Sequence, residues 1–434
     1  LKAGPRLMAR EVTGDMDFKT ARPKERFEDV KGADEAIEEV RLIVESLSDP
    51  EGHAELELPR GIILYGPTGT GKTLLAKAVA GEAGVPFYSL SGASMTSMFV
   101  GATTQRIQTF FSKLRKDLPH ANSPAVAFID EMDGIATERT GKQAADKDRN
   151  SALTQLLYEI GKLFAEYPNV VVIGATNQFD ELDEALKRPG RLGLHIAMPD
   201  PDLYARLGIL QEHAKKLKLE GVELDTIAKL TAGLSGASVA AVPPAAAKIA
   251  RKRGGKGTPA SLHDFERAAM EIVMGILRVK SFVSKANQRI AAAHESGHSV
   301  LAYASPYHQL HIATTYQIKE SGGSTWFSHE DSMVHTADSI LWEVAASMGG
   351  RAAEVIDQSN PSTGCGHDVQ RATRLVLAVV CAGGVYDDFI TEVDVRNWQD
   401  HPLADEISKK VQLVVAEGMQ LAQETLLKHA AFRS

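Results

Sequence analysis

Apolar positions recur at helical spacing over several long stretches of this chain. In residues 34–47 they return every three or four positions, and an Asp-Pro pair follows. This spacing puts the apolar side chains on one face, so it predicts an amphipathic helix that ends before Pro50. Helical patterns also dominate from about 202 to 276, and again from about 280 to 434. A strand-like patch at 310–327 interrupts the last region.

The first half of the chain has three short apolar runs that alternate with helical patterns. Runs of this kind are typical of strands that are buried on both faces of a parallel sheet. They occupy residues 61–65, 125–129 and 170–174. We therefore predict an α/β domain followed by helical regions, with these limits: linker 1–24, α/β domain 25–201, helical lid 202–276 and a mostly α-helical domain 280–434.

The bulk composition excludes some classes of protein. The 434 residues allow two or three domains, and a net charge of −8 with a pI near 6.0 argues against a nucleic-acid partner. The two cysteines, Cys365 and Cys381, cannot form a disulfide framework. We find no apolar run near the ~20 residues that cross a bilayer. The chain begins with Leu1, so we expect a fragment of a longer protein and leave a lost membrane anchor open.

A phosphate-binding motif follows the first apolar run. It has the pattern G-x-x-x-x-G-K-[ST] and leads into a helical segment at 74–83, which is the context that the motif requires. Its glycines let backbone N–H groups face phosphate oxygens, the lysine reaches the β- and γ-phosphates, and the last threonine binds Mg²⁺. The motif predicts ATP binding by Gly66, Pro67, Thr68, Gly69, Thr70, Gly71, Lys72 and Thr73.

Polar residues after the other two apolar runs extend this site. Asp130 is expected to hold Mg²⁺ through water, and Glu131 to orient and deprotonate the attacking water. Asn177 follows the third run, where it can contact the γ-phosphate. Arg188 and Arg191 lie in a later loop and can act on a neighbouring subunit's nucleotide. Each has a plainer interpretation taken alone: helix-capping acids, a turn asparagine and solvated surface arginines.

A second motif, His294-Glu295-Ser296-Gly297-His298, indicates zinc chemistry. Histidines at i and i+4 on a helix face the same way and can both bind Zn²⁺. Glu295 is then placed as a general base for an attacking water. A third protein ligand is needed, and the residues leave four candidates: Glu354, Cys365, His367 and Asp368.

Together these motifs resemble the FtsH-type membrane-anchored AAA metalloproteases, which include the mitochondrial i-AAA proteases. The resemblance extends from about Arg26 to about His429. Besides the two motifs it is carried by residues 27–32, 59–61, 80–87, 98–101, 186–191, 234–237 and 349–354.

The resemblance implies a homohexameric ring, or a ring with sister subunits, that unfolds, translocates and degrades membrane-associated and soluble proteins. It implies Phe99, with Val100 and Gly101, as a pore loop that grips substrate. It also implies Gly236 and Ala237 beside the nucleotide, Asn177 as nucleotide sensor and Arg188 and Arg191 as trans arginine fingers. Asp368 matches the family's third zinc ligand, and residues 322–327 resemble its substrate-pairing strand.

The family is membrane-anchored through an N-terminal segment that this chain lacks. The resemblance therefore implies a mitochondrial inner-membrane or bacterial plasma-membrane location for the full-length protein. The chain departs from the family pattern at Thr68, at residues 192–194, which replace Phe-Asp-Arg, and at Pro243-Pro244 in the lid. Interior prolines cost a helix ~3 kcal/mol each, so we expect the lid helix to be kinked or broken there.

Three hypotheses follow for the function. The first is an ATP-dependent zinc endopeptidase that uses Zn²⁺, ATP and Mg²⁺. The second is an ATP-driven unfoldase or chaperone whose zinc site is structural or silent, although a structural site needs no base such as Glu295. The third is a free-standing zinc peptidase with a vestigial ATPase, which Lys72, Asp130 and Glu131 argue against.

Overall fold

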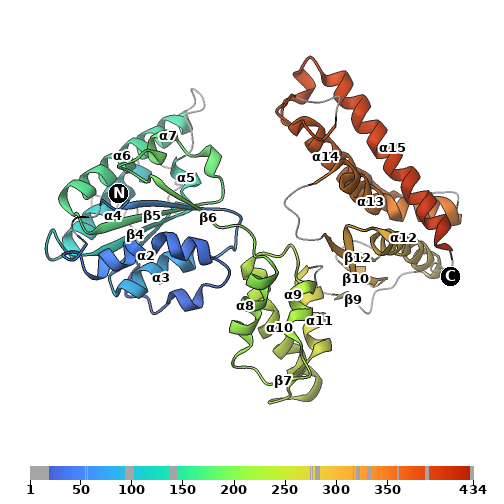
Figure 1. Cartoon of the computed structure of the whole chain (residues 1–434), viewed down its shortest axis with the longest axis horizontal. Helices are drawn as coiled ribbons and strands as arrows, with labels where there is room; N and C mark the ends of the chain where they lie inside the picture. Colours follow the sequence, from blue (N-terminus) through green and yellow to red (C-terminus); the bar gives the residue numbers. More distant parts are fainter. Residues whose placement is uncertain are drawn as a thin grey trace, which may run out of the picture. The chain divides into compact units, whose positions relative to one another are not determined.

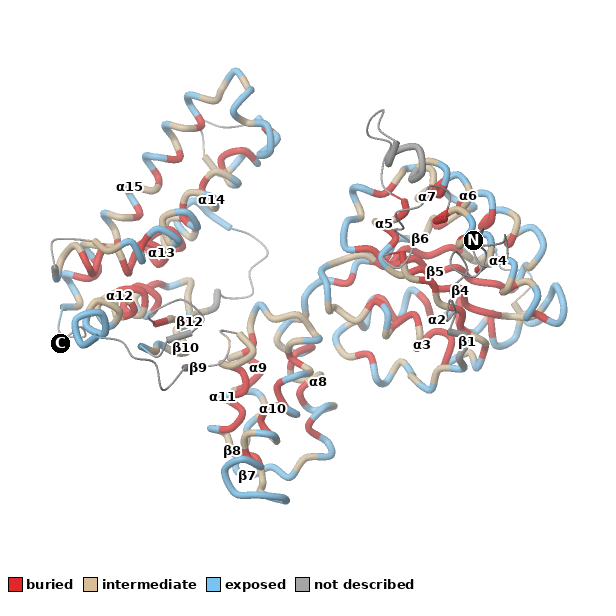
Figure 2. Tube along the Cα trace, turned by 180° about the vertical axis from the view of Figure 1, so that it is seen from behind, coloured by how far each residue is buried: buried red, intermediate tan, exposed pale blue. Residues whose placement is uncertain are grey.

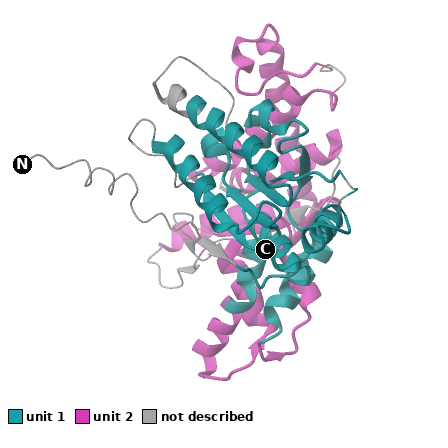
Figure 3. Ribbon diagram, turned by 90° about the vertical axis from the view of Figure 1, so that its left-hand side faces the viewer, with its two compact units in different colours: residues 1–216, 234–244 teal, residues 217–233, 245–434 magenta. Residues whose placement is uncertain are grey.

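The computed structural model describes residues 19–430 except for 54, 56, 93–101, 137–143, 274, 276, 279–283, 316, 319–322, 330–334, 359–360 and 387–390. Two compact units are distinguished: residues 1–216 with 234–244, and residues 217–233 with 245–434 (Figure 3). The predicted substrate-gripping residues Phe99, Val100 and Gly101 lie outside the described residues.

A six-stranded sheet forms the centre of the first unit (Figure 1). Its strand order is β1-β3-β4-β5-β2-β6, and only β1 runs antiparallel to its neighbour. The strands are β1 (Lys19–Ala21), β2 (Gly61–Tyr65), β3 (Phe87–Ser91), β4 (Ala125–Asp130), β5 (Val170–Thr176) and β6 (Leu194–Ala197). The three predicted strands are confirmed as β2, β4 and β5. Sequence reasoning missed β3 and β6, and it assigned the residues of β1 to the linker.

Helices cover both faces of this sheet, which is why its strands are apolar on both sides. All seven residues of β5 are buried. Helices α2 (Asp34–Ser48) and α3 (Lys72–Ala83) pack on one face, and α4 (Ala102–Asp117) and α6 (Ala144–Glu166) on the other. Figure 2 shows the buried positions concentrated in the strands and on the facing sides of these helices. The shorter helices are η1 (Phe27–Asp29), α5 (Asp133–Ala136), η3 (Phe179–Glu181), α7 (Glu184–Lys187) and α8 (Leu203–Ala214).

Helix α2 follows the predicted pattern closely. Its six buried residues are the apolar positions of the sequence pattern, namely Ala36, Ile37, Val40, Ile43, Val44 and Leu47. The helix ends at Ser48, immediately before the Asp-Pro pair, because proline cannot continue the hydrogen-bond ladder.

The residues after α8 form a small helical region. Its helices are α9 (Leu224–Leu230), α10 (Gly236–Gly254) and α11 (Leu262–Val273), and β7 (Leu219–Glu220) pairs with β8 (Ala260–Ser261). The lid helix was expected to be kinked or broken at its proline pair, and it is not broken, since α10 is a single helix with Pro243 and Pro244 inside it. A buried stripe at helical spacing stabilises α10 against the loss of two backbone donors. The stripe consists of Val239, Val242, Ala246 and Ala250.

Replacing Pro244 with Ala should therefore stabilise the chain. Pro244 is exposed, so the change removes no packing, and it restores the backbone donor that α10 lacks. We expect the free energy of unfolding to rise by about 2 kcal/mol, after allowing for the greater freedom of the unfolded chain. Chemical denaturation of both proteins measures the difference. An unchanged midpoint would show that α10 ends at the proline pair in solution.

Residues 277–430 form a mostly helical domain. Its long helices are α12 (Lys285–Ala304), α13 (Ala337–Gln358), α14 (Gly366–Ala382) and α15 (Ala404–Lys428), with short turns η4 (Thr363–Cys365) and η5 (Trp398–Asp400). β10 (His308–Thr314) pairs antiparallel with β12 (Ser324–His329), and β11 (Gln317–Ile318) pairs with β9 (Leu277–Arg278). Among the described residues, no helix combines the length and apolar character that a membrane span requires.

Helices α12 and α13 approach each other through glycines. A Cβ atom on Gly297 would lie 2.1 Å from the carbonyl oxygen of Gly349, and one on Gly350 would lie 2.4 Å from the His294 ring. No side chain fits in these places, so the two backbones pack in direct contact. This close packing places His294, the first histidine of the motif, against α13.

Candidate nucleotide and metal sites

The phosphate-binding motif lines a cavity of about 450 Å³ at the carboxyl end of the sheet. The loop follows β2 and leads into α3, and its Gly69 and Gly71 have φ angles of +85° and +95°, which L side chains rarely adopt. The cavity wall brings together most of the predicted nucleotide residues: Thr68, Gly69, Thr70, Gly71, Lys72, Thr73, Asp130, Glu131, Asn177, Gly236 and Ala237. Gly66 and Pro67 form the start of the same loop.

Hydrogen bonds within the protein hold Lys72 and the expected Mg²⁺ ligands, Thr73 and Asp130, in place. The Lys72 ammonium donates to the carbonyl oxygens of Gly66 and Pro67, both at 2.7 Å. Burial lowers the pKa of Lys72, an effect that the nearby Asp130 opposes. Thr73 Oγ1 donates to Asp130 Oδ2 at 2.9 Å. A hydroxyl and a carboxylate side by side are the oxygen ligands that Mg²⁺ takes beside phosphates.

Glu131 has an unusual backbone conformation. Among the described residues it is the one non-glycine with positive φ, at +52°. Such strain persists where the surrounding structure imposes it, often at functional sites. Its carboxylate accepts a hydrogen bond from Ser91 Oγ at 3.3 Å, and its backbone N–H donates to Asp130 Oδ1 at 3.0 Å. Glu131 is exposed on the cavity wall, where its side chain can meet an attacking water.

The two predicted arginine fingers are absent from this cavity wall. The carbonyl oxygen of Arg191 lies beside Gly61, the first residue of β2, whereas the phosphate loop follows the last residue of that strand. Five strand residues separate the two ends by roughly 13–17 Å. One guanidinium nitrogen of Arg191 donates to the Ala185 carbonyl at 2.7 Å, while Arg188 is exposed. The loop that carries Arg188 and Arg191 therefore lies at the amino end of the strands, opposite the phosphate loop.

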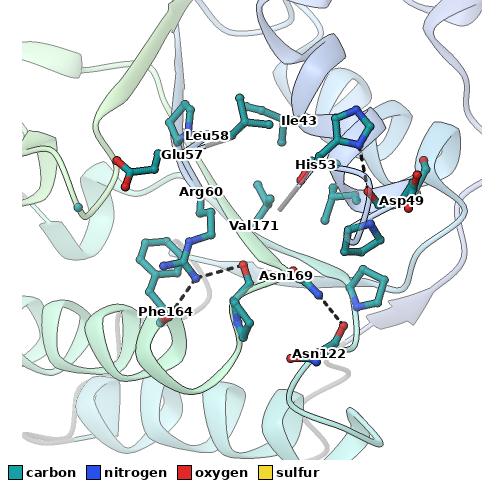
Figure 4. Close-up of a pocket in the computed structure, with 18 of the residues that line it drawn as sticks. Ile43, Asp49, His53, Glu57, Leu58, Arg60, Asn122, Phe164, Asn169 and Val171 are labelled. Atoms are coloured by element: carbon teal, nitrogen blue, oxygen red, sulfur yellow. Dashed lines mark hydrogen bonds between the residues drawn. The ribbon is translucent and has the colours of Figure 1, made fainter. Parts of the chain in front are cut away.

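A second cavity, of about 1170 Å³, lies at that amino end of the strands (Figure 4). Arg60 donates to the carbonyl oxygens of Phe164 and Pro168, at 2.9 and 3.2 Å, and burial lowers the pKa of its guanidinium. The Asn169 amide donates to the Asn122 carbonyl at 2.8 Å. These polar groups bind the backbone, and the phosphate loop is absent from the cavity wall. The smaller cavity, which the phosphate loop lines, is therefore the candidate nucleotide site.

Three potential zinc ligands meet between α12 and α14. His294 Nε2 lies 3.1 Å from His298 Nε2 and 3.1 Å from Asp368 Oδ2, and the last two atoms are 3.5 Å apart. Ligands at about 2.05 Å from a tetrahedral zinc are separated by about 3.3 Å. The three atoms therefore already have the spacing of a zinc site, and together they form one of the possible metal-binding groups among the described residues.

The hydrogen bonds around the two histidines select the tautomer that zinc requires. His294 Nδ1 lies 2.8 Å from Glu354 Oε1, and His298 Nδ1 lies 2.8 Å from the Ala346 carbonyl oxygen. Both partners accept, so each Nδ1 carries the proton and each Nε2 presents a lone pair. Two such nitrogens beside the Asp368 carboxylate need a cation between them, which is either a proton or a metal ion.

The structure distinguishes the four candidate third ligands. His367 is exposed, and Cys365 and Glu354 are buried. Burial and the neighbouring Glu354 carboxylate raise the pKa of the Cys365 thiol to about 11, which disfavours the thiolate that binds metal. Glu354 accepts hydrogen bonds from the backbone N–H and hydroxyl of Ser362 as well as from His294. Asp368, in the first turn of α14, alone reaches both Nε2 atoms.

Glu295 lies beside this group and is only 8% exposed. Thr325 Oγ1 donates to Glu295 Oε2 at 2.6 Å. Burial raises the pKa of Glu295, although the Thr325 hydrogen bond opposes that effect. A carboxylate with a raised pKa is a better proton acceptor, as a general base requires.

Comparison with known proteins agrees with these two sites. Residues 62–200 match the family described as ATPase family associated with various cellular activities, and residues 281–431 match Peptidase family M41. ATP-dependent zinc metalloprotease FtsH 3 of Symbiobacterium thermophilum is 39% identical over 87% of this chain and 59% of its own length. ATP-dependent zinc metalloprotease FtsH of Rhodococcus erythropolis is 36% identical over 94% of this chain and 48% of its own.

A third relative decides the family. ATP-dependent zinc metalloprotease FtsH of Caldicellulosiruptor bescii is 33% identical over 98% of this chain and 71% of its own length. The chain belongs to the FtsH family. The first two FtsH relatives are matched over only about half to three-fifths of their length, so this chain spans part of such a protein. Family membership confirms the predicted fold class, an AAA α/β domain followed by a helical zinc-peptidase domain.

Sequence reasoning missed several groups that shape these FtsH sites. Thr325 is one, because nothing in the sequence relates a strand threonine to a helix glutamate 30 positions away. The Ala346 carbonyl is another, since a backbone acceptor has no sequence signal. Ile209 and His213 of α8 also line the nucleotide cavity, although they lie in the predicted lid.

Zinc affinity should rise steeply with pH. Burial lowers the pKa of His294, but the carboxylates of Asp368 and Glu354 more than offset this and raise it to about 9 in the metal-free site. Below pH 9 zinc must therefore displace a proton, so we expect affinity to rise about tenfold per pH unit between 7 and 8. Competition with a chelator measures it, with Glu354→Gln as a variant that should have a shallower slope. Constant affinity in the unmodified chain would contradict the raised pKa.

Proposed function

We propose that this chain carries the catalytic parts of an ATP-dependent zinc endopeptidase. The observation that carries the proposal is the built metal site: three ligand atoms at zinc spacing, two histidines held in the metal-binding tautomer, and a buried glutamate beside them. The phosphate-loop cavity of the same chain supplies the ATP dependence. The names of the FtsH relatives, ATP-dependent zinc metalloproteases, support both parts.

In the ATPase reaction, Lys72 neutralises the β- and γ-phosphates, and Thr73 with Asp130 holds Mg²⁺. Glu131 takes the proton of the attacking water, and Asn177 helps to orient that water. Gly69 and the other loop residues present backbone N–H groups to the phosphates. Gly236 and Ala237, which line the same cavity, close it from the lid side.

Hydrolysis should also need an arginine from a neighbouring subunit. The loop that carries Arg188 and Arg191 lies at the amino end of the strands, away from the phosphate loop of its own chain. These side chains are therefore proposed to contact the nucleotide of a second copy of the chain. Arginine fingers contribute about 10³-fold or more to phosphoryl transfer. Mixing Arg191→Ala subunits with Glu131→Gln subunits should restore part of the ATP hydrolysis that each lacks alone. Failure of every mixture to exceed the separate variants would exclude action in trans.

In the peptidase reaction, His294, His298 and Asp368 hold zinc, which when bound polarises the scissile carbonyl and lowers the pKa of water. Glu295 accepts the proton of the attacking water and then donates it to the leaving amine. Glu354 and the Ala346 carbonyl keep the histidines oriented. This division of labour leaves Glu295 as a base and not a ligand.

Protein substrates fit the arrangement best. Among the described residues, β12 pairs only with β10, so its other edge can add an extended peptide strand beside Glu295. Phe99, Val100 and Gly101 are proposed to grip the chain that is being pulled. We propose a homohexamer, or a ring with sister subunits, that is anchored in a mitochondrial inner or bacterial plasma membrane through a segment outside this sequence. The −8 net charge gives no support to nucleic acid.

A casein digest tests the proposal directly. Cleavage should require both ATP and zinc, and a zinc chelator should stop it while ATP hydrolysis continues. Cleavage that proceeds equally without ATP would indicate a free-standing peptidase. ATP hydrolysis with no cleavage in the zinc-loaded protein would indicate an unfoldase with a silent metal site.

A further inference from the structure

Strand β12 has two functional faces. Successive strand side chains point to opposite sides, so Thr325 and Trp326 face in opposite directions. Thr325 faces α12, where its hydroxyl donates to the Glu295 carboxylate at 2.6 Å and to the Glu295 carbonyl at 3.1 Å. Trp326 is 9% exposed and belongs to a separate apolar cluster. Two adjacent residues of β12 therefore contact different parts of the protein: Thr325 contacts Glu295, and Trp326 packs in an apolar cluster.

That packing surface belongs partly to the lid. Trp326 forms an apolar cluster with Leu230, Val273 and Ile312. Leu230 ends α9 and Val273 ends α11, whereas Ile312 is the residue opposite Trp326 on β10. The His311 ring lies 4.9 Å from the Trp326 ring and completes the surroundings. The tryptophan thus fills a space between two lid helices and the peptidase hairpin.

A second contact joins the same parts. β9 (Leu277–Arg278) comes shortly after α11, and it pairs antiparallel with β11 (Gln317–Ile318), between the two strands of the hairpin. Backbone pairing holds this segment in register. The segment that follows α11 is therefore paired with β11, and Trp326 packs against the lid helices themselves, so displacement of α11 must pull on the hairpin.

The hairpin has little freedom to absorb such a pull near Glu295. Gly323 precedes β12, and a Cβ atom there would lie 2.7 Å from Glu295 Cγ and 2.8 Å from the Thr314 carbonyl oxygen. The backbone at this point is packed directly against the glutamate. A shift of β12 by a fraction of an ångström therefore moves the Thr325 hydroxyl and the Glu295 carboxylate together.

Helix α8 and the start of α10, which belong to the first unit, contact the nucleotide cavity. Ala237, in the first turn of α10, donates its backbone N–H to the Gly69 carbonyl of the phosphate loop at 2.9 Å. Ile209 and His213 of α8 also line the cavity. A nucleotide bound in the cavity would therefore contact lid residues. A change of nucleotide can shift these residues, as coupling to the peptidase site requires.

We propose that Trp326 couples the lid to the peptidase site, so that the nucleotide state sets the position of Glu295 through Thr325. This inference rests on the proposed ATP-dependent zinc peptidase function. It adds that the ATPase regulates peptide-bond cleavage itself, in addition to delivering substrate. A short unstructured peptide, which needs no unfolding, is then cleaved at a rate that depends on the bound nucleotide.

Tryptophan fluorescence tests the link without using cleavage. The chain has three tryptophans, and Trp342→Phe with Trp398→Phe leaves Trp326 as the only one. ADP and a non-hydrolysable ATP analogue should each change the emission or acrylamide quenching of Trp326. The same titration in a Lys72→Ala background should give no change. An emission that ignores both nucleotides in a protein shown to bind them would overturn the proposal.

Peptide cleavage then tests the consequence. In the zinc-loaded chain, the rate with the ATP analogue should differ from the rate with ADP by about fivefold or more. Leu230→Ala with Val273→Ala should reduce that difference to less than about twofold, while zinc content, ATP hydrolysis and the nucleotide-free rate are unchanged. Leu219→Ala, at an exposed lid leucine, is the matched control and should keep the full difference.

The outcomes separate two kinds of failure. Cleavage at one rate in every nucleotide state, or a nucleotide effect that survives the Leu230 and Val273 changes, would refute the coupling and leave the proposed function intact. Absence of any cleavage in the zinc-loaded chain, or absence of nucleotide binding, would refute the proposed function instead.

Discussion

Glu295→Gln should stop peptide-bond cleavage while zinc remains bound and ATP hydrolysis continues. The amide keeps the size of the side chain and can still bond Thr325, but it cannot accept a proton from water. General-base catalysis contributes about 10²–10⁴-fold, so cleavage should fall by at least that range. Peptide assays, elemental analysis for zinc and phosphate release measure the three properties. Glu417→Gln, at an exposed position of α15, is the matched control.

Asp368→Asn provides the contrast that identifies Glu295 as a base. Asp368 reaches the Nε2 atoms of both histidines, so its loss should weaken zinc binding sharply as well as abolish cleavage. His367→Ala and Cys365→Ser should retain both, because His367 is exposed and the Cys365 thiol stays protonated. Loss of zinc in Glu295→Gln, or full zinc occupancy in Asp368→Asn, would reverse the two assignments.

The second large effect concerns Glu131→Gln. The variant should bind ATP normally and hydrolyse it about 10²–10⁴-fold more slowly, because phosphate and Mg²⁺ contacts remain while the base is lost. Lys72→Ala should instead lose nucleotide binding, since the phosphates lose their main cation. Fluorescent-nucleotide titration separates binding from turnover, and Glu184→Gln on the exposed side of α7 serves as a control. Normal turnover in Glu131→Gln would refute the assignment.

Local patterns predicted much of the α/β domain. The stripe of α2 and the apolar runs of β2, β4 and β5 are signals of burial within a few residues, so they can be read in the chain. β3 and β6 were missed because their sequences mix polar with apolar residues. Of the kink or break expected at Pro243 and Pro244, the break does not occur, because packing of one buried stripe outweighs a local propensity.

The metal site also has a part that the sequence predicted and a part that it left open. His294, Glu295 and His298 lie within one and a half helical turns, so their spacing alone predicted a shared face. The third ligand could not be chosen from the residues, since Glu354, Cys365, His367 and Asp368 are all capable of binding metal. The resemblance to the FtsH family pointed to Asp368, and the fold shows that it reaches both histidines.

The sequence by itself determined the family, the two chemistries and the residues that lie close together in the chain, because phosphate loops and paired helical histidines are local constructions. Only the tertiary structure decided which distant groups meet. Thr325 on Glu295, the Ala346 carbonyl on His298 and the position of the arginine loop at the amino end of the strands each depend on how separate elements pack. Packing joins residues without regard to their separation in sequence, and so leaves no periodic signal in the chain.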